Sequence, residues 1–226
     1  MKGILTFMCC LLVTGSFAQT YPRFEEDIRT IRNYDKIYAA PNKPILFIGS
    51  SSIRKWDDLE RNFASYVVLN RGFGGAVTED VIHYADDIIF PYNPRQIVIY
   101  VGENDLVEET ATADTIFNRF KVLYTIIREK LPAIPIVYIS IKPSPSRATF
   151  FEKAKAANLL ISDYLKTQQR VVFVDIYPKM LDKNGNPRTE LFLQDMLHMN
   201  KSGYAIWEKA IKPYLLKRQK VFLPEM

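Results

Sequence analysis

The segment Pro44-Ile45-Leu46-Phe47-Ile48-Gly49-Ser50-Ser51-Ser52-Ile53 decides the fold of this chain of 226 residues. Its apolar part is continuous rather than alternating, which is typical of a strand that is covered on both faces. A serine-rich turn follows, after which the pattern becomes helical. Four further apolar runs of the same kind predict four more strands, at residues 66–70, 96–102, 134–141 and 171–176.

Helical patterns lie between these runs. A first helix is expected at residues 23–38, and apolar stripes at helical spacing predict three more, at residues 77–88, 116–127 and 151–165. Asn200 stands at the N-cap position of a last helix that runs to about Leu216. Strands that alternate with helices predict an α/β fold, a three-layer α/β/α sandwich with a five-stranded parallel sheet. In such sheets, ligands bind beyond the carboxyl ends of the strands.

The N-terminus has the pattern of a secretory signal peptide. Lys2 is followed by an apolar run from Ile4 to Val13 and then by small residues that end at Ala18. We therefore predict a cleaved leader at residues 1–18 and a secreted or periplasmic mature protein. An uncleaved membrane anchor or a buried helix is the alternative, but the small-residue site favours cleavage. The run is also shorter than the about 20 residues of a membrane span, so no stable span is expected after cleavage.

Composition excludes several kinds of site. The chain's 2 cysteines, Cys9 and Cys10, lie in the predicted leader, so the mature chain would have neither disulfides nor a cysteine nucleophile. The net charge of +5 is mild and the basic residues are scattered, so no nucleic-acid partner is expected. Residues 19–226 contain no repeat, low-complexity block or linker, which predicts a single domain.

Three of the predicted strands end in residues that can carry chemistry. A serine of the Ser50-Ser51-Ser52 turn would lie near helix N–H groups, a placement that suits a nucleophile. A turn that only caps the helix is the alternative. The glycines within residues 72–75 allow backbone N–H groups to approach a ligand. The side chain of Asn104 can donate to a developing oxyanion, or it can form an Asx-turn.

A candidate base lies near the C-terminus. Asp195 and His198 stand three residues apart in a predicted turn, so the carboxylate can bind one ring nitrogen and leave the other to accept a proton. The chain has only 2 histidines. His83 has acidic neighbours at helical spacing, as on a solvated face, which makes His198 the better candidate. Two histidines are also too few for a histidine-rich metal site, and no metal is predicted.

Taken together and in this order, four blocks resemble the SGNH/GDSL hydrolase family, particularly its members similar to platelet-activating-factor acetylhydrolase. The blocks are Phe47-Ile48-Gly49-Ser50-Ser51-Ser52-Ile53, Asn70-Arg71-Gly72-Phe73-Gly74-Gly75, Val101-Gly102-Glu103-Asn104-Asp105 and Asp195-Met196-Leu197-His198. The resemblance implies a flavodoxin-like SGNH hydrolase fold and a carboxylic ester hydrolase that forms an acyl-enzyme and needs no cofactor.

The resemblance also implies the roles of individual residues. Gly49-Ser50-Ser51 occupies the place of Gly-Asp-Ser, which makes Ser51 the nucleophile, with Ser50 or Ser52 as alternative registers. Trp56 matches a common position in the family and supports Ser51. The implied catalytic pair is Asp195 with His198. The implied oxyanion hole consists of Ser51, Gly75 and Asn104, with Gly74 as the alternative glycine.

Substrate is the least determined feature of the sequence. Export and the resemblance favour the removal of short acyl groups, such as acetyl, from a carbohydrate or another small alcohol. The alternatives are a lysophospholipase or thioesterase, an acyltransferase to a sugar, and a non-catalytic carbohydrate- or lipid-binding module. Lys142 and Arg147 follow the fourth strand and are expected near the mouth of the site, where either one can meet an anionic or polyhydroxylated leaving group; a solvated loop is the alternative.

Overall fold

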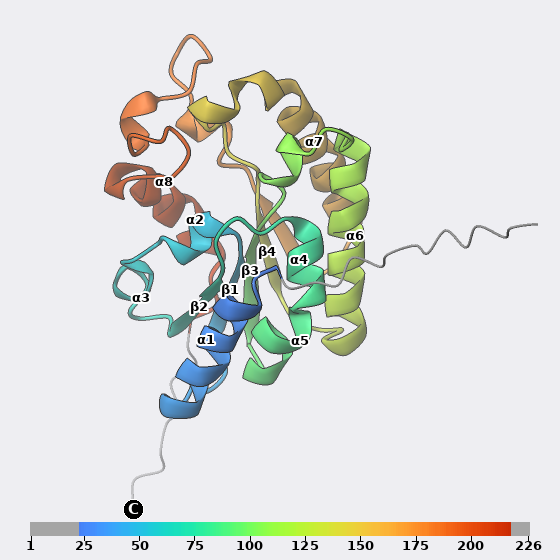
Figure 1. The fold of residues 1–226 in the computed structure, drawn as a ribbon, viewed down its shortest axis with the longest axis vertical. Helices are drawn as coiled ribbons and strands as arrows, with labels where there is room; N and C mark the ends of the chain where they lie inside the picture. Colours follow the sequence, from blue (N-terminus) through green and yellow to red (C-terminus); the bar gives the residue numbers. More distant parts are fainter. Residues whose placement is uncertain (1–22, 218–226) are drawn as a thin grey trace, which may run out of the picture.

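The computed structural model describes residues 23–217, so the predicted leader at residues 1–18 lies outside the described residues. Five parallel strands form one sheet in the order β2-β1-β3-β4-β5, with helices on both faces (Figure 1). The predicted α/β/α sandwich is therefore confirmed. In chain order the strands are β1 Ile45–Gly49, β2 Val68–Gly72, β3 Gln96–Tyr100, β4 Ile136–Ile139 and β5 Val171–Val174.

The strand ends differ from the ends of the apolar runs. Val101 and Ile141 follow β3 and β4 and are fully buried, yet they pack into the core outside the paired region. Val67 adopts a left-handed φ of 52°, so β2 begins after it rather than at residue 66. An apolar run thus records burial, and it overestimates the length of the hydrogen-bonded strand.

Eight α-helices are described: α2 lies where the pattern was expected to become helical after the serine-rich turn, and α3 was not predicted. The helix expected at residues 77–88 is divided at Tyr84, although its apolar stripe is buried as predicted. Pro213 ends the last helix before Leu216, because proline cannot continue the helical hydrogen bonds. The helices are α1 Glu25–Ile37, α2 Ser51–Arg54, α3 Leu59–Asn62, α4 Thr78–His83, α5 Ala85–Ile88, α6 Ala113–Lys130, α7 Phe151–Lys166 and α8 Lys201–Ile211.

Two apolar cores hold the three layers together. One lies between the sheet and helices α1, α4, α5, α6 and α7, and the other lies between the sheet and α2, α3 and α8 (Figure 1). In the second core Trp56, after α2, stacks on Tyr204 of α8 at a centroid distance of 5.0 Å. This packing fixes the start of α8 against the turn that follows β1, and these two segments carry the candidate site.

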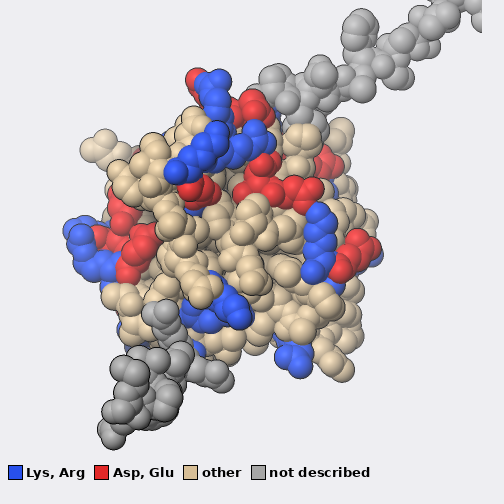
Figure 2. All heavy atoms as spheres, turned by 90° about the horizontal axis from the view of Figure 1, so that it is seen from below, with Lys and Arg blue, Asp and Glu red and all other residues tan. Residues whose placement is uncertain are grey.

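Surface charge is mixed on the face seen from below, where basic and acidic side chains mingle (Figure 2). Between residues 23 and 217, the helices are all too short or too polar to cross a membrane.

Candidate active site

The turn after β1 places Ser51 at the first position of α2. Gly49 ends the strand with a φ of 130°, and a Cβ there would lie 1.8 Å from the carbonyl oxygen of Tyr100, so this position requires glycine. The N–H of Ser50 donates to the same oxygen at 3.1 Å. Ser51 is half-buried, whereas the flanking Ser50 and Ser52 are buried. Of the three candidate serines, Ser51 is therefore the most accessible.

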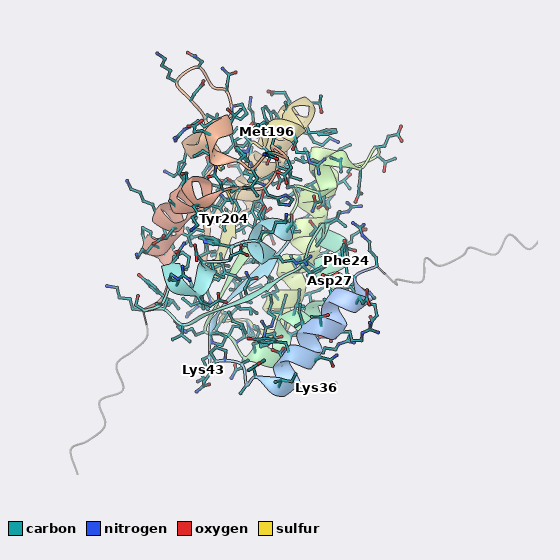
Figure 3. The ribbon with its side chains drawn as sticks, turned by 60° about the vertical axis from the view of Figure 1, so that its left-hand side comes forward. Phe24, Asp27, Lys36, Lys43, Met196 and Tyr204 are labelled. Atoms are coloured by element: carbon teal, nitrogen blue, oxygen red, sulfur yellow. The ribbon has the colours of Figure 1, made fainter. Side chains whose placement is uncertain are left out.

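His198 lies in a tight turn just ahead of α8. Phe192 and Met199 form an antiparallel bridge at the base of this turn. Met196, labelled in Figure 3, adopts a left-handed φ of 52°. Its carbonyl oxygen accepts a hydrogen bond of 3.0 Å from the N–H of Ser146, in the segment that follows β4. The turn is thus fixed both by its own bridge and by a neighbouring loop.

The structure brings Ser51, Asp195 and His198 together. Nε2 of His198 lies 2.9 Å from Oγ of Ser51, and Nδ1 lies 2.6 Å from Oδ2 of Asp195. The other oxygen of Asp195 accepts the N–H groups of Leu197 and His198 at 3.0 and 2.9 Å. The carboxylate therefore holds the ring in an orientation that directs Nε2 at the serine hydroxyl.

Hydrogen bonding sets the charge state of Asp195. Partial burial acts to raise its pKa, but the bonds from the His198 ring and from two backbone N–H groups outweigh burial and hold the pKa of Asp195 well below its usual range. Asp195 is therefore a carboxylate over the whole range in which the imidazole can exchange a proton, as the orienting member of such a pair must be.

The predicted oxyanion residues lie in adjoining segments. Nδ2 of Asn104 donates to the carbonyl oxygen of Ala76 at 2.9 Å, and this bond uses one of the two N–H groups of the amide. Gly75 has a φ of 78°, in the region that favours glycine. Its carbonyl oxygen accepts a bond of 3.0 Å from Arg23, at the N-terminal end of α1, whose neighbouring Phe24 is labelled in Figure 3.

Asp105 connects two segments of the candidate site, a role that the sequence pattern did not indicate. It is fully buried, and its carboxylate accepts the N–H of Thr78 at 3.0 and 3.2 Å and a bond of 3.1 Å from Arg119. Burial raises the pKa of Asp105, and the bonds from Thr78 and Arg119 oppose that rise. Asp105 thereby fastens the start of α4 to the segment of Asn104. A carboxylate next to Asn104, in the segment that follows a fully buried strand, is the signal that could have revealed it.

The prediction for Lys142 is wrong in its location. Its side chain is 0% exposed, and its ammonium group is hydrogen-bonded to Glu103, so it is not available to a ligand at the mouth of the site. Arg147 is partly exposed in the next turn, and its buried Nε has no hydrogen-bond partner among the described residues.

His83, the alternative base, is exposed on α4, where its ring lies edge-on to Tyr84. The imidazole bonded to Ser51 is that of His198. Within residues 23–217, no three His, Asp or Glu side chains cluster closely enough to hold a metal ion.

A groove of about 850 Å³ lies beside the turn that carries His198. Residues that follow α2, residues of this turn and the first two turns of α8 form its walls. Polar and charged side chains outnumber apolar ones in these walls: Lys55, Asp57, Asp58, Asn62, Asn200, Lys201 and Glu208, beside Trp56, Leu193, Met199, Tyr204 and Ala205.

Comparison with protein families gives a match over most of this domain. The profile of the GDSL-like lipase/acylhydrolase family matches residues 47–206, which include Ser51, Asn104, Asp195 and His198. The chain belongs to the GDSL-like lipase/acylhydrolase family. As a member of this family it is a carboxylic ester hydrolase, as the resemblance implied.

Solved structures of similar fold agree with this membership. A Streptococcus pneumoniae protein named for platelet activating factor is 23% identical, with a TM-score of 0.74 over 84% of this chain and 92% of its own. A GDSL-like lipase of Bacteroides thetaiotaomicron is 21% identical, with a TM-score of 0.71 over 84% and 97%. A carbohydrate esterase of family 3 from Talaromyces cellulolyticus is 16% identical, with a TM-score of 0.60 over 76% and 95%. No curated protein matches the chain by sequence.

The lowered pKa of Asp195 predicts how the Asp195→Asn variant responds to acid. A carboxyl whose pKa is lower in the folded than in the unfolded chain stabilises the fold above its unfolded pKa of about 3.9, and this contribution is lost as the pH falls. We therefore expect the free energy of unfolding of the wild type to fall more steeply than that of Asp195→Asn below about pH 4. Urea unfolding at a series of pH values measures both slopes.

The matched control is Gln194→Ala, an exposed residue of the same turn that does not titrate. Its slope should equal that of the wild type. Equal slopes for the wild type and Asp195→Asn would refute the account of the Asp195 hydrogen bonds.

Proposed function

We propose that this chain is a serine esterase in which Ser51 is the nucleophile, His198 the general base and Asp195 the residue that orients the base. One observation carries the proposal. The hydroxyl of Ser51 lies 2.9 Å from Nε2 of His198, whose other nitrogen is held by Asp195 at 2.6 Å. A hydroxyl, an imidazole and a carboxylate in this sequence of contacts form the general arrangement for nucleophilic acyl transfer.

The first half of the reaction forms an acyl-enzyme. His198 takes the proton of the Ser51 hydroxyl on Nε2 while Oγ attacks the ester carbonyl. The N–H groups of Ser51 and Gly75 and the side chain of Asn104 stabilise the oxyanion of the tetrahedral intermediate. His198 then gives the proton to the leaving alcohol, and the bond between the carbonyl carbon and the alcohol oxygen breaks.

The second half returns the enzyme to its starting state. His198 removes a proton from water, and the hydroxide attacks the acyl carbon. The acyl-enzyme bond breaks, Oγ of Ser51 regains the proton from His198, and the carboxylic acid leaves. None of these steps requires a cofactor.

The proposed substrates are esters of short acyl groups, such as acetyl, on a carbohydrate or another polar alcohol. The groove beside the His198 turn is lined by polar as well as apolar side chains, and Lys55, Asp57 and Lys201 can form hydrogen bonds with a polar alcohol. The similarity of fold to a carbohydrate esterase supports the same substrate class.

Arg147 is proposed to contact the polar leaving group. Its turn is bonded to the His198 turn through Ser146 and Met196 at 3.0 Å. Arg147 is partly exposed in this turn, and its guanidinium can donate hydrogen bonds to an oxygen of the leaving group.

Ser51→Ala tests the proposed nucleophile. We expect the hydrolysis rate of p-nitrophenyl acetate to fall roughly 1,000-fold or more, because the variant lacks the hydroxyl that is bonded to His198. Ser65→Ala, which removes an exposed hydroxyl distant in sequence, is the control and should retain the wild-type rate. Equal, near-zero rates for the wild type and Ser51→Ala would instead favour a non-catalytic binding module.

Arg147→Ala tests the contact with the leaving group. We expect kcat/KM on an acetylated oligosaccharide to fall about tenfold, the effect of losing one hydrogen bond from a charged donor, while hydrolysis of p-nitrophenyl acetate stays unchanged. Thr149→Ala, an exposed residue two positions further along, is the matched control. An unchanged kcat/KM on the oligosaccharide would remove Arg147 from the site.

The N-terminal sequence predicts the cellular location of the protein. We propose that cleavage after Ala18 releases it to the periplasm or the medium, because a basic residue, a short apolar run and small residues stand in that order. Intact-mass measurement on protein from cell fractions should find a chain that begins at Gln19. A full-length chain that stays with the membrane would disprove export in this form.

A further inference from the structure

Two opposite charges are buried beneath the candidate site. The side chains of Lys142 and Glu103 are 0% and 4% exposed, and the ammonium and carboxylate groups are in contact. Removing two charges from water is costly, and an apolar pair of similar volume is often at least as stable. Stability alone is therefore a poor explanation for this pair.

The ammonium group of Lys142 has a partner for each of its three protons. Besides Glu103, its Nζ lies 3.1 Å from Oγ of Ser52 and 3.4 Å from the hydroxyl of Tyr100. Tyr100 in turn donates to Glu103 at 2.9 Å. Lys142, Glu103, Ser52 and Tyr100 thus form a closed, fully buried network of directional hydrogen bonds, which apolar side chains could not reproduce.

This network reaches the three segments that carry the proposed chemistry. Ser52 is the neighbour of Ser51, and Glu103 is the neighbour of Asn104. On the third side, the hydroxyl of Ser144 donates to Glu103, and the segment of Ser144 is joined to the His198 turn by the 3.0 Å bond from the N–H of Ser146 to the carbonyl oxygen of Met196.

We propose that the buried Lys142–Glu103 pair sets the relative positions of the nucleophile, the oxyanion amide and the general base. The inference rests on the proposed function, since it assigns a role in the reaction of the same site. Neither side chain touches the reacting atoms, so both are positioning residues. Charge-assisted hydrogen bonds are stronger and more directional than apolar contacts, and they suit a pair that must hold three loops in register. Lys142 thus acts through Ser52 and Glu103, and not on the substrate.

The test compares Lys142→Met, Glu103→Gln and the double variant, which carries both substitutions. Each single variant leaves a charge buried and unpaired and should unfold at a lower temperature, whereas the uncharged double variant should recover much of the loss. A fluorophosphonate probe counts the sites that still react, so kcat is expressed per labelled enzyme. We expect kcat on p-nitrophenyl acetate to be about 10- to 100-fold lower in all three variants, with little change in KM, because small misplacements of reacting groups have effects of this size.

The comparison of kcat with thermal stability decides between positioning and stability. A double variant that regains both the melting temperature and the wild-type kcat would show that the pair only stabilises the fold. A rise in KM that accounts for the whole loss would show that Lys142 acts on the substrate. Either result overturns the proposal.

Ser144→Ala provides an independent variant that leaves no unpaired charge. It removes the hydrogen bond between Glu103 and the segment that contacts the His198 turn, and we expect kcat to fall roughly tenfold while the melting temperature falls less than in the single charge variants. If the double variant does not fold, an unchanged kcat in Ser144→Ala overturns the proposal by itself.

Asp35→Asn is the matched control for the loss of a partly buried ion pair. Asp35, on α1, pairs with Arg71, at 24% and 7% exposure, and also accepts a hydrogen bond from Tyr92. Its kcat per labelled enzyme should equal that of the wild type although its melting temperature falls. An equal loss of kcat in this control would refute the specific role of Lys142 and Glu103. If the wild type neither hydrolyses esters nor reacts with the probe, the proposed function itself is refuted. If the wild type is active and the double variant is equally active, only the positioning role is refuted.

Discussion

The contact between Oγ of Ser51 and Nε2 of His198 joins residues 147 positions apart, and the rest of the structure serves to make it possible. Ser51 follows β1, an inner strand of the sheet, while His198 precedes α8, which packs on one face of that sheet. A parallel sheet directs the carboxyl ends of its strands to one edge. The aromatic packing of Trp56 on Tyr204 then brings α8 to the turn after β1. The contact thus depends on both the strand direction and the second apolar core.

Much of this architecture can be predicted from sequence because apolar runs report burial directly. Five runs predicted five strands, and the fold class followed from their alternation with helices. The N-cap at Asn200 was also predicted, and its side chain accepts the N–H groups of Ser202 and Gly203. The strand limits were less accurate, since Val101 and Ile141 are buried without belonging to the sheet.

Predictions from the local sequence pattern succeeded where the partner was close in sequence and failed where it was distant, whereas the pairing of Ser51 with His198 followed from the family resemblance. Asp195 and His198 are three residues apart, so a turn alone could suggest their bond. Lys142 and Glu103 are 39 residues apart, and nothing local indicates that a lysine beside a proline-rich loop lies in the interior. A lysine is expected on the surface, because burying an ammonium group that has no partner is energetically costly. The exception arises because the partner carboxylate comes from the next strand of the sheet.

The central claim is that Ser51, and not Ser50 or Ser52, carries the reaction. Labelling of the intact protein with a fluorophosphonate, followed by peptide mapping, tests it most directly, because the probe bonds only to an activated hydroxyl. The account predicts a single adduct on Ser51 that is absent from the His198→Ala variant, since the hydroxyl is activated by the imidazole at 2.9 Å. An adduct on Ser50 or Ser52, or one that persists without His198, would contradict it.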